Sequence, residues 1–439
     1  MFDEKMSIDC IDYFIDGWVA GRIESVENDG IYLSDESGVK KFYYNTNSID
    51  DPNFQVKTGD IISVEYNQVD KFFFIDELKI LNSVMENPLA NPNSSYTKLN
   101  KNGKKILSTL KKRQDFFRET RNFFYEDDFI EIHTPTLLES PGVETYIEPF
   151  KTTYYGFNGE ESPFFLPTSP EFSLKEAIGA GLEKIFEIAR VYRNKGENSN
   201  LHSPEFFMLE WYRAYSDYFQ IMDDCFSLIE HIANSIYKTD TIYRKDHKCK
   251  LDDLKKVTVK ELFSKYNINL DNYTKDEEIF KKAIKDFYLD KNNEVLSDDL
   301  NKDDLFFKFF LDNIECKLGF DQPTAVYEYP IEMCALSNPV KNNPNYGERF
   351  ELYIFGIEIA NGFGELTNPV RQKSNFKNIL NLRKKNRAII KQKLPERFLQ
   401  VLKYGIPPCS GVALGLERLF MIFENLNHIK DTNLIETIF

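Results

Sequence analysis

Two apolar runs separated by a polar loop constrain the fold of this chain more than any other feature. Residues 184–194 (KIFEIARVYRN) and 205–215 (EFFMLEWYRAY) are rich in β-branched and aromatic residues, which is typical of buried strands. The short polar loop predicts that the second strand returns beside the first. Residues 349–367 predict two further strands, and the C-terminal region ends with SGVALGLERLFMIFENL, a glycine-containing strand that runs into an apolar helix.

The N-terminal part has a different pattern. Between residues 10 and 80, short runs of β-branched and aromatic residues alternate with turn signals such as ENDG and KTGD. Five short strands in about 75 residues fit a small closed barrel of the OB type, and an SH3-like barrel or a small sandwich is the alternative. Most of the aromatic residues of this barrel are expected in its core: Tyr32, Phe42, Tyr43 and Phe72 to Phe74.

The domain boundaries follow from composition. We predict an OB-like barrel over residues 1–82, a polar linker rich in Asn, Ser and Pro over 83–100, and a larger domain over 101–439. Residues 256–320 are mainly helical in pattern and carry many Lys and Asp residues. They predict a helical insertion at about 240–320, whose charges are those of solvated helix faces.

Charge and cysteine content limit the function classes. The formal net charge of the 439 residues is -15, which weighs against extensive contact with nucleic acid. The six cysteines are spread singly, as in a reduced cytosolic protein without a zinc site. No leader peptide is visible, and no apolar run approaches the roughly 18 residues that span a bilayer. A cytoplasmic protein without membrane association is therefore expected.

The first chemical motif lies at the end of the 184–194 strand. Arg193 ends that strand, and the returning strand and the loop before it bring His202, Glu205, Phe206 and Glu210. A strand, loop and strand edged by arginine, with an aromatic side chain on the return, can clamp a phosphate and stack on a base. Taken alone, the segment would also fit a decorated surface hairpin.

A second motif, RFELYIFGIEIANGFGELT, brings carboxylates to one place. Glu351 and Glu358 can both project toward one site, where hard oxygen ligands hold Mg²⁺ against ATP phosphates. Asn361, Phe363 and Glu365 follow with a period of two, so they share one face of a strand. In the last motif, GVALGLERL, small residues permit close approach of a ligand to the backbone, and Arg418 opens the following helix as a second phosphate clamp.

These blocks resemble the three signature motifs of class II aminoacyl-tRNA synthetases, in order and at similar distances. KILSTLKKRQDFFRETRNFFYEDD has apolar residues at helical spacing, and this predicted helix with the FIEIHTP that follows resembles motif 1. RVYRN with PEFFMLEW resembles motif 2, and GVALGLERL resembles motif 3. TSPEFSLK, HSPEFFMLEWYR and ERFELYIFGIEIANGFGELT are similar to the lysine branch of subclass IIb. The resemblance covers roughly residues 100–430. It implies an α+β catalytic domain, with an antiparallel sheet flanked by helices, that uses ATP and Mg²⁺ to activate an amino acid as its adenylate.

The resemblance also implies roles for single residues. Arg193 would bind the α-phosphate and the substrate carboxylate, and Arg418 the γ-phosphate. Glu351 and Glu358 would hold magnesium, with Glu351 also at the ATP. The remaining ATP contacts would be His202, Glu205 and Phe206, the last stacking on adenine. The amino-acid pocket would comprise Ser169, Glu171, Glu210, Tyr212, Asn361, Phe363, Glu365 and Ala413.

The pocket can also be interpreted from its charges. Two carboxylates, Glu210 and Glu365, that converge in an enclosed site favour a cationic ammonium group and repel an acidic side chain. Neutral substrates would leave a buried carboxylate unpaired, which costs several kcal/mol. The sequence therefore predicts a lysine-like substrate.

Two subgroups of the lysine branch differ in the acceptor of the activated amino acid. Lysyl-tRNA synthetases charge tRNA, and elongation factor P–lysine ligases transfer β-lysine to a lysine of elongation factor P. SPGVETYIEPF, Thr168 and Ser169 before Pro-Glu, and Cys409, Ser410 and Ala413 resemble the second subgroup. An acidic barrel is also poorly suited to bind an anticodon, because single-stranded nucleic acid is bound by aromatic stacking and basic side chains. Elongation factor P is therefore the favoured partner, with tRNA as the alternative.

Three further expectations complete this interpretation. Motif 1 implies a homodimer. The glutamate that usually follows Arg-Asn in motif 2 is Lys195 here, and Glu197 is the candidate to replace it. A non-catalytic synthetase paralogue is a third possible class, but intact Arg193, Arg418 and the two magnesium carboxylates argue against it.

Overall fold

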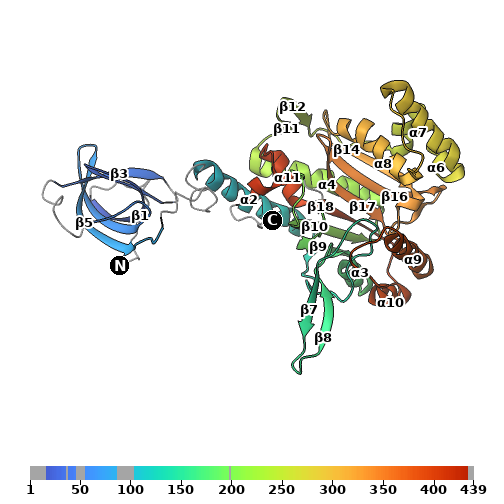
Figure 1. Ribbon diagram of the computed structural model, residues 1–439, viewed down its shortest axis with the longest axis horizontal. Coiled ribbons are helices and arrows are strands. Elements are labelled where there is room, and N and C mark those ends of the chain that lie inside the picture. The colour runs from blue at the N-terminus through green and yellow to red at the C-terminus, as the bar shows by residue number, and fades with distance from the viewer. Residues whose placement is uncertain (1–15, 36–37, 46–54, 87–102, 197–198, 434–439) are drawn as a thin grey trace. The chain divides into compact units, whose positions relative to one another are not determined.

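The computed structural model describes residues 16–35, 38–45, 55–86, 103–196 and 199–433 (Figure 1). The chain divides into two compact units, one with the N-terminal barrel and one with residues 112–432. Most of the predicted linker, and Glu197 of the motif 2 loop, lie outside the described residues.

The N-terminal unit is a closed five-stranded barrel, as the turn pattern predicts. Its strands are β1 (Asp16–Glu27), β2 (Gly30–Ser34), β3 (Val39–Tyr44), β4 (Ile61–Val69) and β5 (Phe72–Asn82). They pair in the order β1-β2-β3-β5-β4 and close through β1 and β4, with β3 and β5 parallel. The OB-like barrel is thereby confirmed.

The prediction that most of the barrel's aromatic residues are core is wrong. Only Phe42 and Phe73 of the six are buried, and their rings meet Tyr66 inside the barrel. Strand alternation turns the others outward, because side chains two residues apart share a face. Tyr43 contacts Phe72 and Phe74 on this outer face, where Phe72 is 50% exposed.

The larger unit is built on a nine-stranded sheet with the order β13-β14-β16-β17-β18-β10-β9-β6, to which β15 adds beside β16. Most pairs are antiparallel, and only β13/β14 and β6/β9 run parallel. The strands are β6 (Ile130–Glu131), β9 (Lys184–Tyr192), β10 (Glu205–Ala214), β13 (Lys255–Thr258), β14 (Thr324–Pro330), β15 (Pro339–Val340), β16 (Asn343–Ile354), β17 (Ile357–Gly364) and β18 (Cys409–Gly415). The α+β class with an antiparallel sheet is confirmed.

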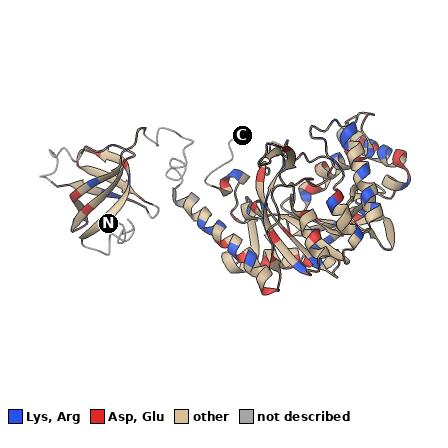
Figure 2. Ribbon diagram, turned by 90° about the horizontal axis from the view of Figure 1, so that it is seen from below, with Lys and Arg blue, Asp and Glu red and all other residues tan. Residues whose placement is uncertain are grey.

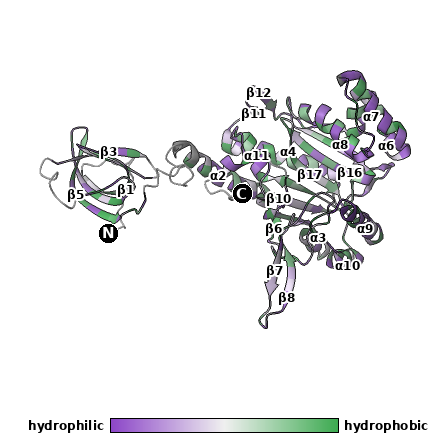
Figure 3. Cartoon of the chain, in the orientation of Figure 1, coloured by the Kyte–Doolittle hydropathy of each residue, from purple (hydrophilic) through white to green (hydrophobic). Residues whose placement is uncertain are grey.

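Helices cover both faces of this sheet. The motif 1 helix α2 (Gly103–Glu126) packs on one face with α4 (Tyr218–Ile232) and α11 (Leu416–Phe423), where Phe124 stacks on Phe186 and contacts Trp211. On the other face lie α3 (Glu171–Gly179), α9 (Pro369–Lys385) and α10 (Glu396–Tyr404) around Leu174 and Phe398. Hydrophobic residues dominate the central strands, in keeping with burial on both faces (Figure 3).

The insertion begins as strands and continues as helices. Residues 241–258 form β11 (Thr241–Arg244), β12 (His247–Lys250) and β13, whereas the sequence pattern predicts a helical insertion from about residue 240. The helices α5 (Val259–Ser264), α6 (Asn272–Lys275), α7 (Glu277–Asn292) and α8 (Lys302–Asn313) follow and share an aromatic core with β14 and β16. A separate hairpin of β7 (Lys151–Tyr155) and β8 (Glu161–Phe165) projects from the unit (Figure 1).

Candidate active site

The central strands place the predicted site residues in rows across one face of the sheet. In the first row Glu351 of β16 lies opposite Asn361 of β17, which lies opposite Ala413 of β18, and Ala413 lies opposite Glu210 of β10. Residues directly opposite one another on neighbouring antiparallel strands point to the same face. Four predicted residues from three distant motifs therefore converge on one face.

The next row adds two more residues predicted for the amino-acid pocket, Tyr212 and Phe363. Tyr212, Gly411 and Phe363 lie opposite one another on β10, β18 and β17. A Cβ added at Gly411 would overlap ring carbons of Tyr212. Glycine is thus required at position 411, because the Tyr212 ring lies directly over its backbone.

Glu210 is a buried carboxylate whose hydrogen bonds come from neutral groups. It is 1% exposed, Ser169 Oγ donates to Oε1 at 2.6 Å, and Tyr212 OH donates to Oε2 at 3.2 Å. Burial and the nearby charge of Glu171 raise the pKa of Glu210 to about 8. Such a carboxylate is poised to accept an ammonium group, which would restore its charge pairing.

A lysine that the sequence analysis did not single out joins the other two pocket carboxylates. Lys175 Nζ lies 2.5 Å from Glu171 Oε1 and forms a second, shorter ion pair with Glu365 Oε2. Lys175 and Glu365 are both buried, and Glu365 Oε1 has no hydrogen-bond donor. Burial raises the pKa of Glu365 to about 8, and Lys175 acts in the opposite direction. The pocket thus holds three carboxylates and one internal ammonium group.

Arg193 lies at the edge of this pocket, just after β9. Its guanidinium group is 5.3 Å from the ring centroid of Phe206, and its Nε donates to Thr168 O at 3.5 Å. Phe206, Met208, Glu210 and Tyr212 alternate along β10, so they share the site's face. The arrangement allows a nucleotide phosphate at Arg193 with its base near Phe206.

Arg418 is held by the motif 2 loop and by β17. It donates to Glu358 O at 2.9 Å, to Leu201 O at 3.3 Å and to His202 Nε2 at 3.0 Å. Because arginine only donates, His202 accepts at Nε2 and carries its proton on Nδ1, 2.6 Å from Ser199 Oγ. His202 and Arg418, which are predicted as separate ATP contacts, are therefore in direct contact.

The two carboxylates predicted to hold magnesium differ in availability. Glu351 accepts from Arg349 and Asn361 at Oε1, and from Tyr329 and Tyr353 at Oε2, which uses all of its lone pairs.

The side chain of Glu358 is 38% exposed, and its carboxylate lies 3.8 Å from Arg418 Nη1. Burial and the charge of Glu351 raise the pKa of Glu358, while Arg418, Arg349 and Arg193 act to lower it. Glu358 fits a magnesium ligand directly. Glu351 fits one only if Asn361 or a tyrosine hydroxyl turns away. Within the described residues no three His, Cys, Asp or Glu side chains gather as metal ligands, so phosphate oxygens would have to complete the shell.

Glu205 is the one predicted ATP contact that the structure does not bring to this face. It directly precedes Phe206 on β10, so strand alternation turns it to the opposite side. There Arg190 Nη1 donates to Glu205 Oε1 at 2.6 Å. Lys195, which stands in place of the usual motif 2 glutamate, has a left-handed backbone with φ of 52° and is exposed.

Several side chains that organise the site have only weak signals in the sequence. Lys175 follows Glu171 by four residues on a helix, a spacing that permits an ion pair. Arg349 precedes Glu351 by two residues on one strand, which places both on one face. Tyr329 comes from β14, and nothing in its local pattern links it to Glu351.

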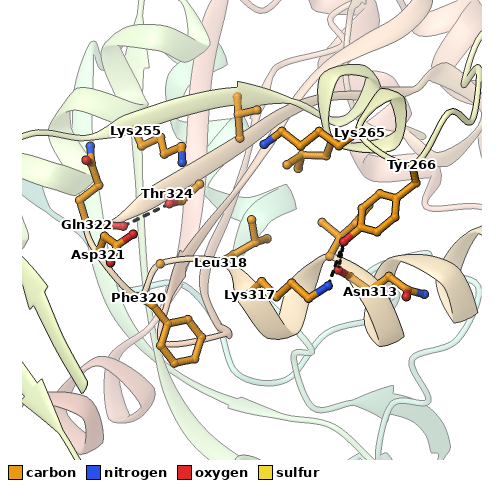
Figure 4. A pocket seen from close by; sticks show the side chains of 14 residues that line it. Lys255, Lys265, Tyr266, Asn313, Lys317, Leu318, Phe320, Asp321, Gln322 and Thr324 are labelled. Carbon is orange, nitrogen blue, oxygen red and sulfur yellow. Dashed lines mark hydrogen bonds between the residues drawn. The ribbon is translucent and has the colours of Figure 1, made fainter. Parts of the chain in front are cut away.

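Other features of the unit lie apart from this site. A cavity of about 200 Å³ between β13, α5 and α8 is lined by Lys255, Lys265 and Lys317 and contains none of the predicted site residues (Figure 4). Along the helices, Lys and Arg are interspersed with Asp and Glu (Figure 2).

In the described part of the chain, no helix has the length and apolar character needed to cross a membrane.

Comparison with known proteins places this geometry in a family. The profile of the family "tRNA synthetases class II (D, K and N)" matches residues 91–435. An elongation factor P–(R)-β-lysine ligase of Haemophilus ducreyi is 32% identical over 340 residues, which are 77% of this chain and 96% of that protein. One from Buchnera aphidicola is 34% identical over 74% of this chain and 94% of its own length.

A lysine–tRNA ligase of Buchnera aphidicola is also similar, at 34% identity over 76% of this chain, but the match covers only 64% of that enzyme. The profile match, the order of the motif strands and the convergence of their residues on one face agree with one another. The chain therefore belongs to the class II tRNA synthetases (D, K and N), and it is an amino-acid ligase of that type.

Proposed function

We propose that this enzyme activates lysine or β-lysine with ATP, as the adenylate, and transfers it to a lysine side chain of elongation factor P. The observation that carries the substrate assignment is Glu210, a buried carboxylate held by two hydroxyl groups beside the Lys175–Glu365 pair. An ammonium group is the partner that such a carboxylate lacks.

The arginines and carboxylates of the site support the activation step. Arg193 would bind the α-phosphate while the substrate carboxylate attacks it, and Arg418 would hold the γ-phosphate of the departing pyrophosphate. Magnesium, when bound at Glu358 and Glu351, would neutralise phosphate charge. Asn361 Oδ1, which is buried without a hydrogen bond, would accept from an ammonium group of the substrate. The residues then act by positioning and charge stabilisation.

Two observations favour the protein acceptor over tRNA. The match spans 94–96% of the elongation factor P ligases but 64–66% of the lysine–tRNA ligases. The barrel that would read an anticodon is acidic in sequence, and Lys41, which lies over the Tyr43 ring on its outer face, is already paired with Glu27 and Asp29.

We also propose a homodimer formed through the motif 1 helix. On α2 a hollow of about 480 Å³ is lined by residues that include Phe117 and Tyr125, and Tyr125 is 49% exposed. A second copy of the chain would cover this apolar and basic face. The cysteines of the described segments are free thiols, which fits an enzyme of the cytoplasm.

The acceptor is tested by supplying both candidates to one enzyme preparation. We expect ATP–pyrophosphate exchange with (R)-β-lysine or α-lysine, followed by transfer of the radiolabelled amino acid to elongation factor P. We expect little transfer to tRNA. Efficient charging of tRNA with no label on the protein would overturn the proposed acceptor and leave the activation step intact.

The position of the substrate amino group is tested at Ala413. Its methyl group lies in the row between Glu210 and Asn361, so Ala413→Gly opens space where an α-amino group would sit. We expect the ratio of kcat/KM for α-lysine to that for β-lysine to rise about tenfold, the scale of one methyl group in a pocket. The KM for ATP serves as the control and should not change. An unchanged ratio would remove Ala413 from substrate discrimination.

A further inference from the structure

Lys175 is the one fully enclosed cation of the amino-acid pocket in the described part of the chain. It is 3% exposed and lies one helical turn after Glu171 on α3, with Glu365 on the segment after β17. Its ammonium group therefore bridges two substrate-facing carboxylates that come from distant parts of the chain. The bridge is independent of any ligand.

The bridge does not complete the hydrogen bonding of its partners. Both carboxylate oxygens of Glu365 are buried and neither accepts a hydrogen bond, although Oε2 forms the ion pair with Lys175. A self-contained structural ion pair would satisfy its buried oxygens with nearby backbone or side-chain donors. Glu210, the third carboxylate predicted for the pocket, likewise has only hydroxyl donors. When all three carboxyl groups are ionised, their negative charges therefore exceed the single positive charge of Lys175 by two.

This imbalance matches a particular class of substrate. With all three carboxyl groups ionised, one internal ammonium group leaves two negative charges, and a diamino acid brings two ammonium groups that would favour this ionised state. The carboxylate of the diamino acid would lie at Arg193, so it does not enter this count of pocket charges.

We propose that Lys175 is a positioning residue that holds Glu171 and Glu365 together through its two ion pairs and so sets the pocket to accept a substrate with two ammonium groups. The inference rests on the proposed lysine-like substrate. It adds that the enzyme supplies one ammonium group of its own, without which the two carboxylates would repel one another.

The pKa of Glu365 depends on the charged and titratable groups that face it. They are Lys175, Glu171, Tyr212 and the Cys409 thiol. Of these only Lys175 carries positive charge, so it alone lowers the pKa of Glu365, which burial raises to about 8. Removal of the ammonium group should raise that pKa further. The ionised fraction of Glu365 at neutral pH would then fall further, and its carboxylate would become available to the substrate only at higher pH.

The test is Lys175→Met, which keeps the length and apolar volume of the side chain. In lysine-dependent ATP–pyrophosphate exchange we expect the KM for lysine to rise at least about tenfold at pH 7, since one pKa unit is a factor of ten. The loss should shrink toward pH 9, while the KM for ATP stays near that of the wild type. Lys175→Arg keeps the charge and should retain the wild-type pH profile even if packing lowers its rate.

A double-mutant cycle with Glu365→Gln separates positioning from general damage. Because Lys175 acts through Glu365, the Lys175→Met/Glu365→Gln variant should bind lysine no worse than Glu365→Gln alone, with no residual pH dependence from this position. Additive losses, or a Lys175→Met profile that is lowered equally at every pH, would overturn the inference. Thermal unfolding of each variant identifies any that fail to fold. If Lys175→Met does not fold, the pH profile of Lys175→Arg is compared with that of the wild type instead.

Failure of this inference is distinguishable from failure of the proposed function. If the wild-type enzyme shows no lysine-dependent exchange, the proposed substrate is wrong. If the wild type is active and Lys175→Met keeps its KM for lysine and its pH profile, only the role of Lys175 is wrong.

Discussion

Arg193→Ala is expected to lower amino-acid-dependent ATP–pyrophosphate exchange by about 10²–10³-fold, the scale for loss of one preorganised donor to a developing charge. Arg193 lies at the edge of the pocket with its guanidinium group over Phe206, on the side of the sheet that holds Glu210. Exchange reports the activation step alone, so the result does not depend on the acceptor. The loss should be largest in kcat, because the charge on the α-phosphate develops in the transition state.

Arg190→Ala is the matched control for this experiment. Arg190 comes from the same strand, β9, but pairs with Glu205 on the opposite face and is half exposed. An exposed ion pair contributes little to stability, so this variant should keep most of the activity. Equal losses in Arg190→Ala and Arg193→Ala would contradict the assignment of the active face.

Glu210→Gln is expected to damage activity and improve stability at the same time. The amide keeps the shape of the side chain but cannot pair with an ammonium group, so the KM for lysine should rise by about 100-fold or more, equivalent to roughly 3 kcal/mol. The folded protein, however, loses a buried carboxylate that has no cation of its own. Its midpoint of thermal unfolding should therefore rise in the absence of substrate.

The pH dependence of this stability effect follows from the pKa of Glu210, which is raised to about 8. Between the ordinary pKa of a glutamate, 4.5, and about 8, the folded protein retains a proton that the unfolded chain releases. Wild-type stability from this group therefore falls as pH rises through that range. The advantage of Glu210→Gln should be larger at pH 8 than at pH 5. An equal advantage at both values, measured by thermal unfolding, would show that Glu210 is not a buried, unpaired acid.

Much of the fold is predictable from local pattern. The strands β9 and β10 coincide closely with the predicted apolar runs, because a strand buried on both faces is apolar along most of its length. β16 and β17 are the two strands predicted within 349–367, although β16 begins earlier, at Asn343. The OB-like barrel follows from five short runs between turn signals. The orientation of its aromatic residues does not, since four of six lie outside the core and a one-residue shift exchanges the faces.

The site is predictable to the extent that residues two apart on one strand share a face. That rule alone groups Asn361 with Phe363, and Glu210 with Tyr212. The same rule excludes Glu205, which directly precedes Phe206, although the family resemblance assigns it to ATP. Register across β16, β17, β18 and β10 then decides that Glu351, Asn361, Ala413 and Glu210 form one row.

The sequence by itself determined that this chain has the motifs of amino-acid activation and a pocket rich in carboxylates, because these depend on residue types at fixed local spacing. Only the tertiary structure decided how the charges of that pocket are balanced. Lys175 reaches Glu365 across 190 positions of the chain, and Tyr329 reaches Glu351 from another strand. Such pairs are fixed by strand order and helix packing, which no local spacing encodes. For this reason the internal ammonium group of the pocket became visible only in three dimensions.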